Sequence, residues 1–259
     1  MTETFPNMSD KHNSTPAFSA ADLMAYRRHR GTAPTYTPPE TVVLCYQNNF
    51  FHEAHARYRT EKVDGFLGDL YLYKAKRGRI GVAGNFGIGA PVTAMIMEDL
   101  ISYGVKQFII LGMAGGLQPE LRPGHVIIAK RAIRDEGTSH HYVPPEKFAE
   151  ASPTLTHHLS QSFHSDGIPH QLGCTWTTDA PYRETTAEVL QYQKEGVLTV
   201  EMEAAAMFSV GHALGAQVAA AYVVSDSIAK GHLEFNHFPE RVVVTFNALL
   251  GAILNHRFV

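Results

Sequence analysis

The segment QFIILGMAGGL, Gln107–Leu117, joins an apolar run of strand length to a glycine-rich sequence. Its first part, Gln107–Leu111, is typical of a buried strand. The glycines of Gly112–Gly116 predict a tight turn at which the backbone can approach a ligand closely. The preceding segment, Ala90–Tyr103, has the apolar spacing of a helix. A helix, a buried strand and a glycine turn in this order are typical of α/β proteins, in which ligands gather at the carboxyl ends of the strands.

The same alternation of strand and helix patterns runs through most of the chain. Further strands are predicted at Thr41–Tyr46, Phe66–Tyr73, Ile80–Ala83, His125–Lys130, Leu198–Val200 and Val218–Val224. Further helices are predicted at Ala20–His29, Glu146–Ser162 (interrupted near Pro153), Thr186–Glu195, Met202–Leu214 and Pro239–His256. We therefore expect a single α/β domain with a mainly parallel central sheet and helices on both faces. Residues 1–38 are predicted to form a polar N-terminal arm with a short helix, and residues 39–259 the domain itself.

The bulk composition excludes several classes of protein. The chain has 259 residues, 44% of them hydrophobic, and a formal net charge of −3, so it lacks the basic excess of a nucleic-acid binder. Two cysteines, Cys45 and Cys174, do not make a disulfide framework, which favours a reducing compartment. No apolar run approaches the roughly 20 residues of a membrane-spanning helix. We expect a cytoplasmic protein without a membrane or nucleic-acid partner.

The histidines do not predict a metal site, although the chain has 15 of them. The HEAH sequence at 52–55 lacks the spacing of the zinc-binding HExxH helix. The paired histidines at 140–141 and 157–158 point to different sides of a helix or strand. We therefore expect no bound metal.

A second glycine-rich segment, GNFGIGAP at 84–91, lies between a predicted strand and a predicted helix. Gly87 and Gly89 would let the backbone approach a ligand, and the helix N-terminus that follows favours anions or oxygen-rich groups. A plain strand-to-helix turn is the alternative. Together with Gly112 and Gly115, however, this segment predicts two glycine turns at neighbouring strand ends, which favours a ligand site.

The sequence VEMEAAA at 200–206 takes a strand into a helix of small residues. Glu201 and Glu203 flank Met202, and carboxylates at this position are unusual for a core. They could be solvated glutamates favoured by the helix dipole. The functional interpretation is that one glutamate accepts hydrogen bonds from vicinal sugar hydroxyls while Met202 packs on the face of the sugar.

The strand predicted at Val218–Val224 ends abruptly in Ser225 and Asp226. A Ser-Asp pair at such a point commonly stabilises a turn. If Asp226 faces a pocket instead, removal from water favours its protonated form, and the carboxyl can act as a general acid.

These four segments, in their order along the chain, resemble the purine nucleoside and uridine phosphorylase family, which also includes the methylthioadenosine/adenosylhomocysteine nucleosidases. The resemblance extends from about Thr41 to the C-terminus and implies a nucleoside phosphorylase-like fold and cleavage of an N-glycosidic bond. It implies that Glu203 binds the ribose 2′- and 3′-hydroxyls with Met202 against the sugar and Glu201 nearby. It also implies that Asp226, held by Ser225, hydrogen-bonds or protonates N7 of a purine-like base.

The resemblance also indicates which residues surround the base. The segment RDEGTSHHYVPP at 134–145 is similar to one that lies near the base and sugar in uridine phosphorylase-like members, which places His141 and Tyr142 in the pocket. TTDAPYRET at 177–185 resembles the segment that stacks on the base, but Pro181 stands where an aromatic residue is usual. The residues that could replace this aromatic ring are Trp176, Tyr182 and Arg183.

The phosphate site departs from the family pattern. The stretch after the first strand, CYQNNFF at 45–51, lacks the family's phosphate-binding sequence, and Ile110 and Met113 stand at the second glycine turn where arginine and Ser or Thr are usual. An aliphatic chain cannot replace the bidentate grip of a guanidinium on an anion. Nor does Asn48 or Asn49 supply the carboxylate with which the nucleosidases position water. The phosphate site is therefore either missing or rebuilt from His52, His55, Arg57 or a neighbouring subunit.

We therefore predict phosphorolysis of a purine-like nucleoside to free base and sugar 1-phosphate. Hydrolysis of the same bond and nucleoside binding without turnover are the alternatives. No cofactor is expected other than phosphate as a co-substrate. The resemblance further implies a homo-oligomer, either a dimer or a ring of dimers.

Overall fold

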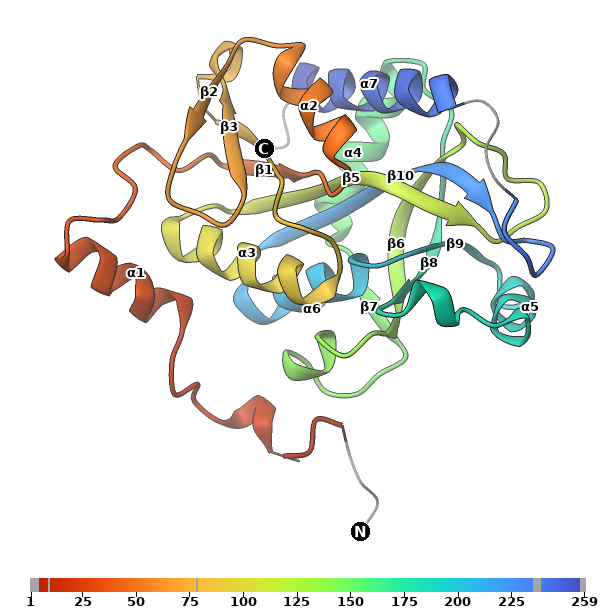
Figure 1. Cartoon of the computed structure of the whole chain (residues 1–259), viewed down its shortest axis with the longest axis horizontal. Helices are drawn as coiled ribbons and strands as arrows, with labels where there is room; N and C mark the ends of the chain where they lie inside the picture. Colours follow the sequence, from red (N-terminus) through yellow and green to blue (C-terminus); the bar gives the residue numbers. More distant parts are fainter. Residues whose placement is uncertain (1–4, 9, 78, 235–238, 257–259) are drawn as a thin grey trace.

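The computed structural model describes residues 5–8, 10–77, 79–234 and 239–256. A single sheet runs through the molecule, with helices packed against it (Figure 1). Its strands are β1 (Thr41–Leu44), β2 (Thr60–Val63), β3 (Asp69–Tyr73), β4 (Ile80–Gly84), β5 (Gln107–Gly116), β6 (Val126–Asp135), β7 (Phe148–Glu150), β8 (Gln171–Thr178), β9 (Val197–Glu201) and β10 (Gln217–Ser227). The helices are α1 (Ala20–His29), α2 (Asn48–Ala56), α3 (Ala90–Tyr103), α4 (Pro153–Ser165), α5 (Thr186–Lys194), α6 (Ala204–Leu214) and α7 (Pro239–Asn255).

The sheet is mixed, so the prediction of a mainly parallel sheet is wrong. Strands β4, β1, β5 and β10 lie parallel to one another, as do β6, β8 and β9. These two groups meet in antiparallel pairs, β10 with β6 and β5 with β9, and the hairpin β2–β3 adds two more antiparallel pairings at the other edge. Because β10 also pairs with β5, the strands β5, β10, β6, β8 and β9 close into a ring.

Helices cover both faces of the sheet, as the sequence predicts (Figure 1). Helices α3 and α6 share one apolar core with the inward side chains of β1, β5 and β10. Helices α2, α4 and α7 share a second core on the opposite face. Helix α1 packs on the outside of α3. None of the helices in the described part of the chain is long and apolar enough to cross a membrane.

Most predicted elements are present, and two helices have the predicted bounds. Helices α1 and α3 begin and end at the predicted residues. The helix predicted at Glu146–Ser162 is replaced by strand β7 followed by α4, which begins at Pro153. Helix α6 begins at Ala204 rather than Met202, because Glu203 is its N-cap residue. Elements α2, β2 and β8 were not predicted.

The glycines at 112–116 do not form a turn, because β5 continues through them to Gly116. A Cβ added at Gly115 would lie 3.1 Å from Val200 on β9 and 3.2 Å from the Asp226 carboxylate on β10. A Cβ at Gly112 would lie 3.5 Å from the Gln47 side chain. The glycines therefore allow close approach of neighbouring side chains rather than a change of chain direction.

The N-terminal arm extends away from the sheet (Figure 1), and the part of it before α1 contacts the segment that follows β6. The Phe5 ring packs on His140 and His141 at centroid distances of 5.6 and 5.4 Å. Lys11 Nζ lies 2.8 Å from His141 Nδ1. The arm thus contacts the short 3₁₀ helix η3 (Ser139–His141) that follows β6.

Gly84 allows α2 to pack against the end of β4. A Cβ at this position would overlap the Phe51 ring, whose side chain is fully buried. We expect Gly84→Ala to lower the free energy of unfolding by about 1–3 kcal/mol, the usual effect of overpacking a core. Urea unfolding monitored by circular dichroism measures the change.

Gly251→Ala is the matched control, because Gly251 lies in helix α7 and a Cβ there meets only the Tyr58 hydroxyl at 3.7 Å. Alanine favours a helix over glycine by about 1 kcal/mol, so this variant should not be destabilised. Equal destabilisation of both variants would contradict the packing argument.

Candidate active site

Two adjoining cavities open at the carboxyl ends of β1, β4, β5, β9 and β10. The first, here called the carboxylate cavity, has a volume of about 510 Å³, and its lining includes Glu184, Glu201, Met202, Glu203 and Asp226. The second, here called the amide cavity, has a volume of about 930 Å³, and its lining includes Gln47, Asn48, Asn49 and Asn85. The two share the residues Gln47, Ile88, Met113, Ser225 and Asp226.

Glu201 joins the start of α6 to the surrounding strands. One carboxylate oxygen accepts a hydrogen bond from Thr177 Oγ1 at 2.5 Å. The other accepts from the backbone N–H groups of Glu203 and Ala204 at 2.8 and 2.7 Å and from the Tyr222 hydroxyl at 2.9 Å. Glu201 therefore satisfies N–H groups that the helix itself leaves free, a structural role that differs from both interpretations of the sequence.

Glu203 reaches from the β9–α6 junction to the start of α3. Its Oε1 accepts a hydrogen bond from the backbone N–H of Gly89 at 2.8 Å, and its Oε2 accepts a longer one from Met202 N at 3.3 Å. Gly87 and Gly89 both have positive φ values, 96° and 97°, so this glycine turn is present as predicted. The turn aims the N-terminus of α3 at a carboxylate, which the helix dipole favours.

The two glutamates are buried next to each other, and this raises the pKa of both. Burial is the main cause for each, since it disfavours the charged form. The pKa of Glu203 rises to about 8 because the charge of Glu201 adds to the effect of burial, against the opposing hydrogen bonds from Gly89 and Met202. Glu203 is thus a buried acid that titrates near neutral pH and lines the cavity, a combination typical of functional sites.

Asp226 lies across the carboxylate cavity, where β10 ends. Its Oδ2 accepts a hydrogen bond from the Ser225 hydroxyl at 2.7 Å. The absence of a side chain at Gly115 leaves room for its Oδ1. The structure therefore brings Met202, Glu203 and Asp226 to the lining of one cavity, although 22 residues lie between the last two in the sequence.

Glu184 also lines this cavity, although no sequence pattern predicts it as a site residue. It follows the short 3₁₀ helix η4 (Pro181–Arg183) and precedes α5. Burial and the nearby charge of Asp226 raise its pKa to about 7. The one feature that could have indicated Glu184 is that it is a charged residue in TTDAPYRET, a segment expected to contact the base.

Several residues predicted to contact the base lie elsewhere. Trp176 is fully buried in a separate apolar cluster, where its Nε1 donates to Asp135 at 2.9 Å, so its prediction as a base-stacking residue is wrong. The Tyr142 hydroxyl donates a hydrogen bond to Glu98 on α3, and His141 contacts the N-terminal arm. Tyr182 lines the cavity edge but is fully exposed. The residues among these that do not line either cavity are His141, Tyr142, Trp176 and Arg183.

No lysine or arginine is among the described residues that line the two cavities. Met113 lines both cavities. Ile110, which was expected beside Met113 at the second glycine turn, lies within β5 instead, and its side chain is fully buried in the core and lines neither cavity. His52 and His55 lie on α2, where the His55 ring stacks on Tyr71 at a centroid distance of 4.0 Å. His52, His55 and Arg57 are not among the described residues that line the carboxylate cavity or the amide cavity.

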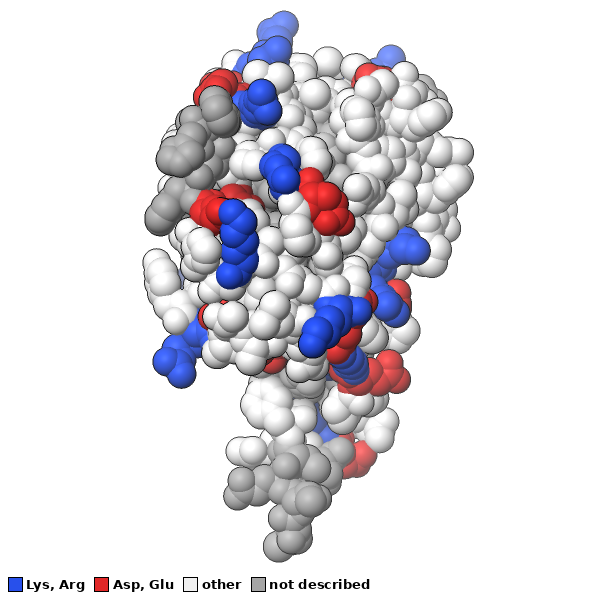
Figure 2. All heavy atoms as spheres, turned by 90° about the vertical axis from the view of Figure 1, so that its right-hand side faces the viewer, with Lys and Arg blue, Asp and Glu red and all other residues white. Residues whose placement is uncertain are grey.

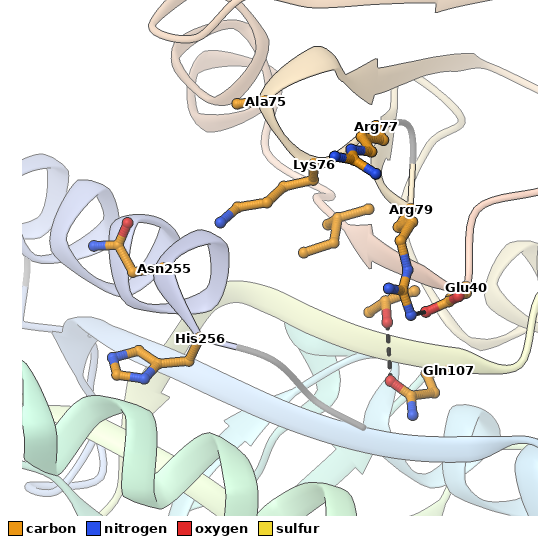
Figure 3. Close-up of a pocket in the computed structure, with 10 residues that line it drawn as sticks. Glu40, Ala75, Lys76, Arg77, Arg79, Gln107, Asn255 and His256 are labelled. Carbon is orange, nitrogen blue, oxygen red and sulfur yellow. Dashed lines mark hydrogen bonds and ion pairs between the residues drawn. The ribbon is translucent and has the colours of Figure 1, made fainter.

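Three basic residues line a separate cavity at the opposite ends of the strands. This cavity has a volume of about 360 Å³ and is lined by Lys76, Arg77 and Arg79 (Figure 3). Arg79 forms an ion pair with Glu40. On the face next to α5, positive and negative side chains are mixed rather than gathered into a patch of one sign (Figure 2). Within the described ranges, no group of three or more side chains of His, Cys, Asp or Glu is placed so that it could hold a metal ion.

Comparison with known proteins agrees with this arrangement. The family model described as "Phosphorylase superfamily" matches residues 43–255. A DeoD-type purine nucleoside phosphorylase of Bacillus cereus is 30% identical over 202 residues, which cover 73% of this chain and 85% of that protein. Uridine phosphorylases of Haemophilus influenzae and Treponema pallidum are 33% and 36% identical over 143 and 136 residues, which cover 50% and 48% of this chain. The matched stretch spans only 57% and 53% of these two relatives.

The crystal structure of a uridine phosphorylase from Vibrio fischeri has the same fold, with a TM-score of 0.70 and 23% sequence identity over 85% of this chain and 93% of that one. Fold and site define an α/β protein whose buried glutamate faces a cavity at the strand ends. Because the family model covers residues 43–255, the chain belongs to the phosphorylase superfamily.

The raised pKa of Glu203 predicts how stability changes with pH. A carboxyl whose pKa is higher in the folded state stabilises the fold below its unfolded pKa of about 4.5, and this stabilisation is lost as the pH rises through about 8. The free energy of unfolding should therefore fall in this range by up to about 1.4 kcal/mol per pH unit. In Glu203→Gln this fall should be clearly smaller. Urea unfolding at pH 5.5, 6.5, 7.5 and 8.5 measures it.

Glu120→Gln removes an exposed carboxyl outside both cavities and serves as the control. It should keep the pH dependence of the parent protein. Parallel stability curves for the parent and Glu203→Gln would show that Glu203 is not the titrating group.

Proposed function

We propose that the chain cleaves the N-glycosidic bond of a purine-like nucleoside with phosphate as the acceptor, giving free base and sugar 1-phosphate. The observation that carries this proposal is that Met202 and Glu203 line the same cavity as Ser225 and Asp226. Relatives of the chain include purine nucleoside phosphorylases and uridine phosphorylases, which supports a nucleoside as substrate.

Glu203 is the proposed ligand of the sugar. Its carboxylate can accept hydrogen bonds from two vicinal hydroxyls, and Met202 beside it offers an apolar surface to the ring. Binding of the two hydroxyls favours the charged form of Glu203, since hydrogen bonds to a carboxylate lower its pKa. Glu201 is a positioning residue in this proposal, because its oxygens bind the N–H groups that start α6 and so fix the backbone of Glu203.

Asp226 is the proposed proton donor to the departing base. Cleavage of the glycosidic bond makes the sugar oxocarbenium-like, and negative charge develops on the base as it leaves. A carboxyl at N7 of a purine can neutralise this charge, and Ser225 holds the Asp226 carboxylate in place. This role of Asp226 is what favours a purine-like base in the proposal.

Hydrolysis is a second candidate function, favoured by the lining of the amide cavity. The neutral side chains of Gln47, Asn48 and Asn49 can hydrogen-bond to phosphate or to water, but they lack the charge with which guanidinium groups bind phosphate. In a homo-oligomer, a neighbouring subunit could supply the missing positive charge, and phosphate rather than water would then be the acceptor. The candidates for this contribution are His52, His55 and Arg57.

An assay of base release with and without phosphate tests the acceptor. We expect release from purine nucleosides to rise with phosphate into the millimolar range and to yield sugar 1-phosphate. The apparent KM for phosphate should be roughly ten- to a hundredfold higher than for a site with a bidentate arginine, since that contact is worth a few kcal/mol. Full-speed release of free sugar without phosphate would replace phosphorolysis by hydrolysis, and nucleoside binding without release would exclude both.

Replacement of Asp226 tests the leaving-group role. Asp226→Ala should slow purine nucleosides by about a hundredfold, the usual contribution of a positioned general acid. Nucleosides whose base leaves without protonation should be much less affected, and Ser225→Ala should cause a smaller loss because it only loosens the carboxylate. Steady-state kcat on both kinds of substrate measures this. Equal losses on both would mean that Asp226 is structural.

A further inference from the structure

The cavity at the amino ends of β1, β4 and β5, here called the basic cavity, lies apart from the two cavities of the candidate active site. Its lining includes Thr41, Ile80 and Gln107, the residues with which these three parallel strands begin. The other walls are the short 3₁₀ helix η2 (Lys74–Lys76) and the C-terminal end of α7 (Figure 3). The basic cavity shares none of its described lining residues with the carboxylate or the amide cavity. A ligand bound here therefore lies at the opposite end of the strands from the proposed reaction.

The positive charge of the basic cavity comes from the sequence KAKRGR at 74–79. Arg79 forms an ion pair with Glu40, the one acidic residue of the described lining. The side chains of Lys76 and Arg77 form no hydrogen bond or ion pair with any described residue. The cavity therefore holds two uncompensated positive charges, in a chain whose formal net charge is −3.

The arrangement of these cations distinguishes a ligand site from a turn whose charges are simply solvated, the common state of lysine and arginine. Figure 3 shows the Lys76 side chain extending toward the end of α7, whereas Arg79 lies on another side of the cavity. Thr41 and Ile80 are only 4% and 8% exposed, so the cavity also has a buried floor. The cations thus stand on different walls of one hollow, where a single ligand can contact them together.

The lining also indicates the class of ligand. Guanidinium and ammonium groups are donors only, and they bind phosphate oxygens through charge-assisted hydrogen bonds. A ligand that contacts cations on different walls needs negative charge at both of its ends. The described lining contains no Phe, Tyr or Trp, so it offers no such ring on which a nucleobase could stack. The volume of about 360 Å³ is near the lower limit of ligand pockets, which favours a small ligand with two linked phosphate groups and no base.

We propose that the basic cavity binds a small diphosphate, either inorganic pyrophosphate or an ester of similar size, through Lys76, Arg77 and Arg79. Lys76 and Arg77 supply the uncompensated charge. Arg79 supplies N–H groups beyond those that face Glu40, since a guanidinium has five. This site does not depend on the proposed function, because it holds neither the nucleoside nor the acceptor.

Isothermal titration calorimetry of the full chain with pyrophosphate, in phosphate-free buffer, provides the first test. Binding should weaken as NaCl rises from about 50 to about 200 mM, since salt screens exposed charges. Lys76→Gln combined with Arg77→Gln should weaken binding by about tenfold or more, because both uncompensated charges are lost. Lys130→Gln combined with Lys194→Gln is the matched control, since it removes two exposed lysines outside the cavity. Equal affinity of the two double variants, or no binding by the parent protein, would overturn the proposal.

Glu40→Gln provides a second test, in which the affinity should rise. The substitution removes the acidic residue of the described lining and releases Arg79 from its ion pair, so pyrophosphate should bind several-fold more tightly. Glu120→Gln removes an equal charge far along the chain and should change the affinity little. A misfolded variant does not bind more tightly, so this test holds even if the double variant fails to fold. If Glu40→Gln binds pyrophosphate no better than Glu120→Gln, the proposal is wrong.

Orthophosphate tests the class of ligand. A single phosphate group cannot contact cations on different walls at once, so it should bind the parent protein about tenfold more weakly than pyrophosphate. If the two anions bind with equal affinity, and both lose it in the double variant of Lys76 and Arg77, the site takes a single phosphate group and the diphosphate class is overturned.

Discussion

The buried Glu201 carboxylate is the interaction on which the geometry of the site depends. It ties together β8 through Thr177, β10 through Tyr222, and the start of α6 through two backbone N–H groups. These bonds replace the water that a carboxylate loses on burial. Because Glu203 is the N-cap residue of α6, the same bonds fix where its side chain reaches α3. One buried carboxyl group with satisfied hydrogen bonds thus positions a second one, which the proposed function gives to the sugar.

The distribution of charge along the strands distinguishes the two ends of the sheet. At the carboxyl ends the described lining has four carboxyl groups and no lysine or arginine, whereas Lys76, Arg77 and Arg79 lie at the opposite end. Burial and mutual repulsion bring Glu184 and Glu203 into the neutral pH range. Such a cavity suits a neutral, donor-rich ligand like a nucleoside. It does not suit phosphate, so a phosphorylase would need donors from the amide cavity or from another subunit.

Local patterns predicted the helices and the site-forming strand ends better than the shape of the sheet. Helix α3 is continuous in its apolar spacing and flanked by glycines, so its bounds follow from the sequence. The antiparallel pairing of β9 with β5 depends on contacts distant in sequence that Gly115 permits, and no local pattern shows this. Resemblance placed Met202, Glu203 and Asp226 correctly at one cavity. The resemblance gives no correct position for Trp176 or Glu184, because the position of each side chain depends on which side of the β8–α5 connection faces the cavity.

A crystal structure with a non-cleavable purine nucleoside analogue tests the central claim most directly, namely that Glu203 and Asp226 face the two halves of one nucleoside. The account predicts that the sugar 2′- and 3′-hydroxyls lie at hydrogen-bond distance, about 2.6–3.2 Å, from the Glu203 carboxylate, with Met202 against the ring. It also predicts that the base lies beside Asp226. An analogue bound with its sugar away from Glu203, or bound outside the carboxylate cavity, would contradict it.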